Sequence, residues 1–127
     1  MFANLELLRL SGAMAAHAGT RQAMIAGNIA HADTPGYRAR DLPSFAETIS
    51  RQDQTMRATR AAHLNGTGTP AQSHRAVERA DKAADPNGNT VMLEEEMQHA
   101  VAVKRQHDRA IAIYRSTMSI LRSTIGR

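Results

Sequence analysis

The chain has 127 residues, of which 42% are hydrophobic but only 3% aromatic, with a net charge of +4 and a pI near 10.3. This length allows one domain, residues 1–127, and the shortage of aromatic side chains leaves Ala, Met and short aliphatic residues to form a core suited to packed helices. There is no cysteine, which excludes disulfides, thiol catalysis and thiolate metal sites.

The first predicted element is a helix over residues 3–32, with Asn4 or a neighbour as its N-cap. A broken apolar stripe follows helical spacing, and a second strip contains only small residues. The stripe consists of Leu7, Leu10, Met14, Ala18, Ile25 and Ile29. The small-residue strip consists of Gly12, Ala16, Gly19, Ala23, Ala26 and Ala30. Because glycine costs a helix about 1 kcal/mol relative to alanine, we expect another helix backbone to approach this strip closely. The alternative is a solvent-facing, alanine-rich strip.

The apolar N-terminus superficially resembles a secretory signal peptide. No Lys or Arg precedes its apolar part, however, and Glu6 and Arg9 interrupt it. We therefore expect no cleaved signal peptide of this kind. No apolar run in the sequence approaches the length of a membrane span.

A turn motif is predicted over residues 33–41. Pro35 disfavours helical geometry at Thr34 and so ends the first helix. Gly36 can adopt the positive φ that a Pro-Gly turn requires.

Residues 42–90 form a variable middle segment. Its first part, 42–54, is predicted to be a short helix in which Ser44 and Glu47 form a capping box and Phe45 and Ile49 face inward. Residues 55–64 are expected to be extended and residues 65–90 to form a loop. Asn87-Gly88 predicts a turn, after which Asn89 or Thr90 can cap the last helix.

The last predicted element is a helix over residues 91–126. Its apolar positions recur at steps of four and three, the spacing of a seam that faces a partner helix. The seam consists of Leu93, Met97, Ala100, Lys104, His107, Ile111, Tyr114, Met118, Leu121 and Ile125. Acidic residues occupy its first turn and Arg122 its last, which suits the helix dipole. The expected fold is therefore mainly α, with the two terminal helices pairing as a coiled-coil-like hairpin.

The sequence offers no constellation that would carry catalysis. Six histidines invite a search for metal ligands, but Glu95, His99 and His107 are more simply solvated helix residues than a converging zinc site. No phosphate loop, dinucleotide fingerprint or nucleophile elbow occurs. We expect no enzyme, metal or cofactor. A small basic DNA-binding helical protein remains the alternative function, although the basic residues are not gathered on one face.

Two separated strings resemble the flagellar rod and hook protein family. The string Asn28-Ile29-Ala30-His31-Ala32-Asp33-Thr34-Pro35-Gly36-Tyr37-Arg38-Ala39-Arg40-Asp41 is similar to its N-terminal signature, in particular to that of its proximal rod members. The string Pro86-Asn87-Gly88-Asn89-Thr90-Val91, followed by an acidic segment and Met97, is similar to the lead-in to their last helix. His31 and Gly27 stand where the family commonly has Asn, and Met92 replaces a common acidic residue.

The resemblance implies a structural subunit of the proximal rod of the bacterial flagellar basal body. Such a subunit is exported through the flagellar type III apparatus and assembles in the periplasm through its terminal helices into the axial drive shaft. The implied partners are copies of itself, other rod proteins, the basal-body adaptor protein between ring and rod, and the type III export gate. Nucleic acid and a membrane-spanning role are not implied.

The predicted assembly interface combines the helix seams with the signature string. It consists of Gly12, Ala16, Gly19, Ala23, Ala26, Asn28, Ile29, Ala30, Thr34, Pro35, Gly36, Tyr37, Met97, Ile111, Tyr114, Met118, Leu121 and Ile125.

Overall fold

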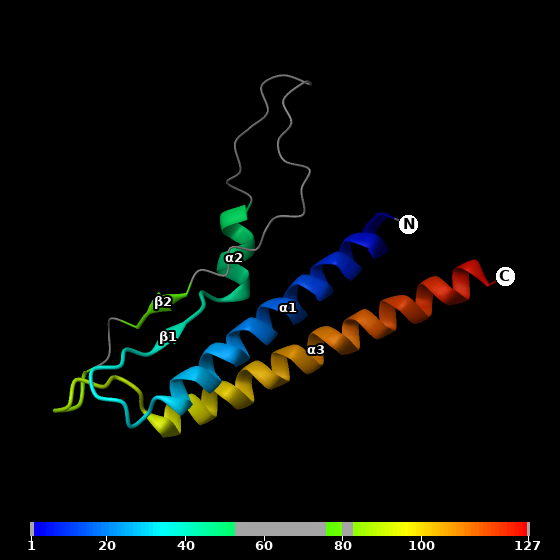
Figure 1. Cartoon of the computed structure of the whole chain (residues 1–127). Helices are drawn as coiled ribbons and strands as arrows, with labels where there is room; N and C mark the ends of the chain where they lie inside the picture. Colours follow the sequence, from blue (N-terminus) through cyan, green and yellow to red (C-terminus); the bar gives the residue numbers. More distant parts are fainter. Residues whose placement is uncertain (1, 53–75, 80–82, 127) are drawn as a thin grey trace, which may run out of the picture.

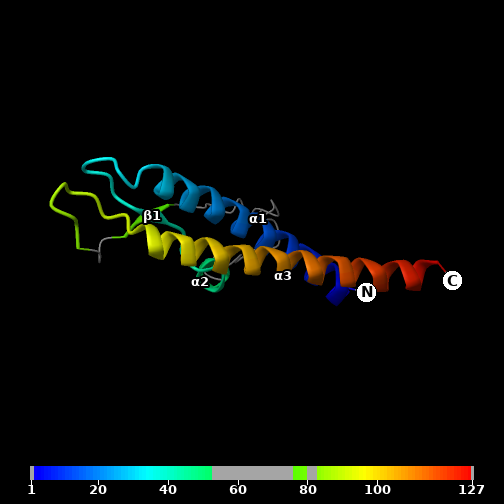
Figure 2. The same cartoon turned by 90° about the horizontal axis from the view of Figure 1, so that it is seen from below.

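The computed structural model describes residues 2–52, 76–79 and 83–126 (Figure 1). The elements follow in the order α1 (Phe2–Ala30), β1 (Arg40–Asp41), α2 (Phe45–Gln52), β2 (Val77–Glu78) and α3 (Leu93–Ile125). Helices α1 and α3 run antiparallel beside each other, so both ends of the chain lie at the same end of the hairpin (Figure 1). The view from the perpendicular direction shows the same pairing (Figure 2). The predicted mainly α fold with paired terminal helices is confirmed.

Helix α1 differs from its predicted bounds at both ends. It already begins at Phe2, so Asn4 lies inside the helix and the expectation that Asn4 caps it is wrong. It ends at Ala30, two residues before the predicted end at Ala32. A turn follows, in which the His31 amide is shared between the carbonyls of Gly27 and Asn28 and the Ala32 amide bonds that of Ile29, only three residues back, at 3.2 Å.

The contact between the two long helices is made mainly by small side chains. Helix α1 contributes the buried residues Ser11, Ala18, Ile25 and Asn28. Helix α3 contributes Glu96, Val103, Ala110 and Thr117, which recur at intervals of seven residues. The apolar centre is the cluster of Ala18, Ile25 and Val103, with Ile29 and Ala100 packed beside it. Residues of this size allow the helix axes to approach closely.

The seam predicted for α3 is therefore only partly correct: Ala100 packs beside the buried cluster, but the most buried line of α3 is a different one. The observed line passes through Val103 and Ala110, one residue away from the predicted positions Lys104 and Ile111. Along a helix, one residue is a rotation of about 100°. As a result Met97, Tyr114 and Ile125 are exposed on the hairpin. Periodicity misplaced the seam because the largest apolar residues flank the contact and do not occupy it.

The end of the turn motif and part of the middle segment form a two-stranded antiparallel sheet at one end of the hairpin (Figure 1). Strands β1 and β2 pair Arg40 with Glu78 and Asp41 with Val77. The prediction that all of residues 65–90 form a loop is therefore wrong at β2, and the extended segment predicted for residues 55–64 lies outside the described residues.

The axis of helix α2 is steeply inclined to the two long helices (Figure 1). Its predicted capping box is confirmed, since the Ser44 amide donates to Glu47 at 3.0 Å and the Glu47 amide to Ser44 Oγ at 3.3 Å. The buried ring of His17 contacts Phe45, and its Nε2 lies 3.0 Å from the Pro43 carbonyl oxygen. These contacts tie the start of α2 to α1.

We expect the described hairpin to be most stable near the β1–β2 end and least stable near the chain ends. The buried apolar cluster lies around Ile25 and Val103, whereas Leu7 and Ile120 are exposed. Amide exchange in the full-length free subunit should therefore be slower at Ile25 and Val103 than at Leu7 and Ile120, by on the order of tenfold or more. Hydrogen exchange read by NMR measures this difference, and uniform exchange along both helices would contradict it.

Candidate functional site: the elbow and the outer helix faces

The two strings that carry the family resemblance meet in space. We call their meeting point the elbow, formed by residues 28–42, 76–79 and 85–96. The side-chain amide of Asn89 donates to the carbonyls of His31, Ala32 and Thr34, in the turn that follows α1. Its Oδ1 accepts the Val91 amide at 2.8 Å. Asn89 therefore holds the turn after α1 against the segment that leads into α3.

The expected N-cap of the last helix is correspondingly wrong. Met92 occupies that position and makes no side-chain cap hydrogen bond. Thr90 is also engaged elsewhere, because its Oγ1 accepts the Ala39 amide at 2.9 Å and its own amide donates to the Tyr37 carbonyl.

Two glycines allow the strings to touch. Gly36 has a φ of 72° and Gly88 a φ of 80°, as the two predicted turns require. The Gly36 amide donates to the Asn87 carbonyl at 3.0 Å. A Cβ atom on Gly88 would lie 3.4 Å from the Gly36 Cα atom, so the two turns are in direct backbone contact, and the positive φ makes any other residue at position 88 strained.

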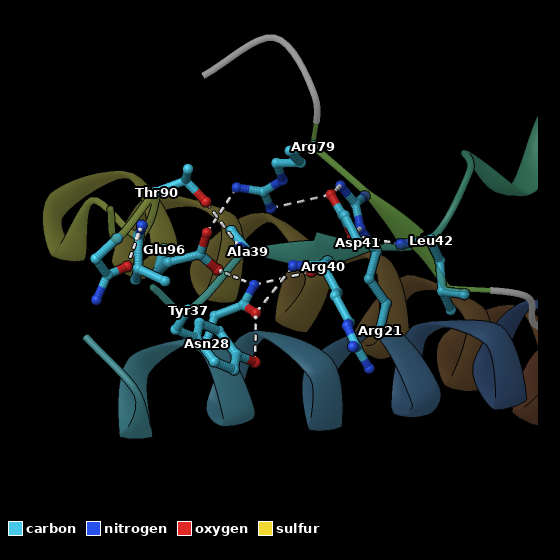
Figure 3. Close-up of polar contacts among 12 residues, drawn as sticks. Arg21, Asn28, Tyr37, Ala39, Arg40, Asp41, Leu42, Arg79, Thr90 and Glu96 are labelled. Carbon is cyan, nitrogen blue, oxygen red and sulfur yellow. Dashed lines mark hydrogen bonds and ion pairs between the residues drawn. The ribbon is translucent and has the colours of Figure 1, made fainter. Parts of the chain in front are cut away.

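Asn28 joins the end of α1 to β1. Its Oδ1 accepts the Arg40 amide at 3.1 Å, and its Nδ2 donates to the Arg40 carbonyl at 2.8 Å (Figure 3). The Asn28 side chain thus forms with Arg40 the pair of hydrogen bonds that a residue of a neighbouring strand would form. Nδ2 also lies 3.1 Å from Glu96 Oε2, and the Tyr37 hydroxyl donates to Oδ1 at 3.3 Å.

A chain of four charges runs through the elbow. Arg21 on α1 makes two hydrogen bonds of 2.7 Å to the carboxylate of Asp41. Arg79 reaches both Asp41, at 3.1 Å, and Glu96, at 2.6 Å (Figure 3). Two positive and two negative groups therefore balance. This balance matters because the Glu96 side chain is only 1% exposed, and an unpaired carboxylate is costly at such a site.

The ion pair changes the titration of both Arg21 and Asp41. Burial by itself raises the pKa of Asp41, but the hydrogen bonds and charge of Arg21, with smaller help from the Leu42 amide and Arg79, lower it below its ordinary value. The hydrogen bond to Asp41 raises the pKa of Arg21. Both groups are therefore held in their charged forms.

The predicted interface residues that lie in the elbow differ in their exposure to solvent. Asn28 is buried and Tyr37 half-buried, whereas Thr34, Pro35 and Gly36 are exposed. The Tyr37 ring stacks on His31 with centroids 4.5 Å apart, and His31 Nδ1 lies 2.8 Å from the Gly27 carbonyl oxygen. His31 thus packs and hydrogen-bonds locally at the end of α1.

The small-residue strip of α1 faces away from α3. Its six members are all exposed on the hairpin: Gly12, Ala16, Gly19, Ala23, Ala26 and Ala30. No atom of another part of the described chain lies within 4 Å of a Cβ placed on Gly12 or Gly19. The close approach of a helix backbone at this strip is therefore not made by α3.

The predicted interface residues of α3 border the strip that contacts α1. Ile111, Met118 and Leu121 are half-buried, as is Ile29 on α1, while Met97, Tyr114 and Ile125 are exposed. Met97 is 58% exposed and Ile125 77%. The other large apolar residues described as exposed on the two long helices are Leu5, Leu7, Leu10, Leu93, Val101 and Ile120, and Met92 is exposed directly before α3.

The described residues do not gather groups for catalysis or metal binding. Across residues 2–52, 76–79 and 83–126, no three His, Cys, Asp or Glu side chains converge on a possible metal position. A hollow beside His107, Asp108, Ile111, Ala112 and Arg115 is lined by one helix alone. Within the described ranges, neither long helix has the length and apolarity needed to cross a lipid bilayer.

Comparison with known proteins bears on this architecture. No protein-family model matches the chain. The chain is 29% identical over 128 residues to the flagellar basal body rod protein FlgB of Agrobacterium fabrum, a match that covers 97% of this chain and 95% of the relative. The chain is a homologue of flagellar basal body rod proteins. A second FlgB, from Cereibacter sphaeroides, is 39% identical over 83 residues, and this match covers 64% of each chain. The resemblance found in the sequence is confirmed by these FlgB relatives.

The sequence patterns did not single out three members of the charge network, Arg21, Arg79 and Glu96. Arg21 and Arg79 carried no motif, and Glu96 was read only as one of three acidic residues in the first turn of α3. A usable signal exists for Glu96, because it opens the line that continues at intervals of seven through Val103, Ala110 and Thr117. Nothing local identifies Arg79, whose partners lie 17 and 38 residues away.

The lowered pKa of Asp41 predicts a specific loss of stability in acid. A depressed carboxyl pKa stabilises the fold above the unfolded value of about 3.9, and this contribution is lost as the pH falls below that value. Asp41→Asn should therefore be less stable than the wild type at neutral pH, and the difference should shrink below about pH 4. Urea unfolding of both proteins between neutral and acidic pH measures it. A difference that stays constant down to the acid limit would contradict the role of Asp41.

Proposed function

We propose that this chain is a structural subunit of the proximal flagellar rod, and that the outer faces of its two long helices bind neighbouring subunits. The observation that carries the proposal is the combination of homology to FlgB with a helical hairpin that leaves large apolar side chains uncovered on both helices. Helices that remain apolar on an exposed side favour association, because contact with a partner removes this surface from water.

The composition of the hairpin interior supports this proposal. The buried apolar residues of the two long helices are Ala18, Ile25, Val103 and Ala110. Three of these four side chains are Ala or Val and only Ile25 is large, whereas the exposed set contains several leucines, isoleucines and methionines. A pair of helices of this length is stabilised mainly by tertiary packing. Neighbouring subunits would supply the packing that the hairpin alone does not make.

The proposed partners follow from the rod assignment. They are copies of this chain and other rod proteins along the axis, with the basal-body adaptor protein at the membrane side and the type III export gate during export. The proposed location is the periplasmic rod. The role is structural and not catalytic, and the alternative of a DNA-binding protein finds no support among the relatives.

A single charge on the exposed apolar face tests the proposal. Met97→Asp places a carboxylate on α3 where the hairpin leaves the side chain 58% exposed, so the free subunit should keep its helicity. An interface that buried this charge without a partner would lose several kcal/mol. Incorporation into purified basal bodies and motility should therefore be lost.

The matched control for this test is Gln98→Asp, at the adjacent exposed position. It introduces the same charge into the same helical turn but replaces a polar side chain. We expect it to assemble and to support swimming. Equal incorporation of the two variants would show that the Met97 face is not an interface.

Substitutions that add a larger side chain to the small-residue strip of α1 test the proposal independently. Any side chain at Gly19 points into open space on the hairpin, so Gly19→Ala and Gly19→Leu should both raise the helicity of the free subunit, by up to about 1 kcal/mol of helix stability. If a helix of a neighbouring subunit lies against the strip, leucine overpacks the contact, at a typical cost of about 1–3 kcal/mol per copy.

We therefore expect Gly19→Leu to block incorporation into basal bodies and Gly19→Ala to permit it. Circular dichroism of the free subunits verifies that neither substitution harms the hairpin. Normal assembly of the leucine variant would show that the strip faces solvent and contacts no neighbouring subunit.

A further inference from the structure

The elbow buries two carboxylates from different parts of the chain. Asp41, in β1, has a side chain 16% exposed, and Glu96, in the first turn of α3, has one 1% exposed. Arg21 on α1 occupies both oxygens of Asp41. Without a further positive group, the described network would hold two negative charges and one positive charge in a place with little water.

Arg79 supplies the missing charge and comes from the middle segment. Its backbone amide donates to the Ala39 carbonyl at 3.0 Å, directly after the β2 residues that pair with β1. Its side chain is 12% exposed, with Nη1 2.6 Å from Glu96 and Nη2 3.1 Å from Asp41. One planar guanidinium thereby bridges both carboxylates, a geometry that suits arginine and that the single nitrogen of lysine does not reproduce.

We propose that β2 together with Arg79 acts as a strap that closes the elbow. In the closed state, Arg79 is the counter-ion that allows Glu96 to be buried between α1 and α3. When the strap leaves, Glu96 retains the amide of Asn28 but loses its opposite charge. The buried carboxylate then draws water into the elbow, and the contacts around Asn28, Ala39 and Thr90 loosen. Docking of the middle segment and order at the end of the hairpin are therefore coupled.

The coupling is specific enough to be reversed by a second substitution. Arg79→Met removes the charge while keeping a long apolar side chain. Glu96→Gln then removes the charge that requires Arg79, and the glutamine can still accept from Asn28. If Arg79 acts by compensating the charge of Glu96, the elbow of the double variant should be closed again. If Arg79 acts only by packing, the elbow of the double variant should stay open.

The experiment is hydrogen exchange on the full-length free subunit, read at the amides of Ala39, Arg40 and Thr90. These amides donate to Thr90 Oγ1, Asn28 Oδ1 and the Tyr37 carbonyl, so they report on the closed elbow. Arg79→Met should accelerate their exchange on the order of tenfold or more, because it leaves a buried charge without its partner. Arg79→Lys should fall between the wild type and Arg79→Met.

The control is Arg38→Met, which removes an exposed arginine of the same elbow and should leave exchange unchanged. The double variant Arg79→Met/Glu96→Gln should return exchange close to the wild-type rate, even if Arg79→Met alone unfolds the subunit more widely. The strap is refuted if Arg79→Met exchanges like Arg38→Met, or if Glu96→Gln fails to restore protection in the Arg79→Met background.

Discussion

The burial of Glu96 between the two long helices is the constraint on which the elbow depends. A carboxylate at this depth requires both hydrogen-bond donors and an opposite charge. Asn28 provides the donor from α1 and Arg79 the charge from the middle segment. Because these three residues belong to three separate parts of the chain, satisfying one side chain fixes how α1, α3 and β2 meet.

The two ends of the hairpin consequently differ in kind. At the elbow, directional hydrogen bonds and balanced charges specify a single arrangement, since each group is satisfied only when its partners are in place. Along the helices, a narrow line of small side chains makes the contact, and the larger apolar groups lie beside it. The molecule is thus closely specified at one end, while large apolar side chains stay exposed along its length.

Local chemistry in the sequence predicted local structure well. The Ser44–Glu47 capping box and the positive φ of Gly36 and Gly88 follow from residues a few positions apart, and all three are observed. The long helices were predictable because propensity and periodicity accumulate over many turns. The face of α3 that meets α1 was not, because two neighbouring lines share helical spacing and side-chain size favoured the wrong one.

Contacts across the fold escaped sequence reasoning for a different reason. Asn89 was expected to cap the helix that follows it, yet its amide serves carbonyls more than 50 residues earlier. An asparagine in a turn has several equivalent local roles, and only the approach of the other turn decides among them. Arg79 is the clearest example. An arginine beside Glu78 in a polar segment is expected to be solvated, and its role is visible only in the folded chain, where Asp41 and Glu96 lie close together.

The pairing of Asp41 with Val77 also governs how the chain between them can change. The chain leaves the hairpin and returns to it at neighbouring points, so an insertion between these positions need not alter the geometry of α1 and α3. Closing a longer loop costs only about 0.6 kcal/mol for each doubling of its length. Chains with very different intervening segments could therefore share one hairpin, and evolution could add or remove residues there without redesigning the two long helices.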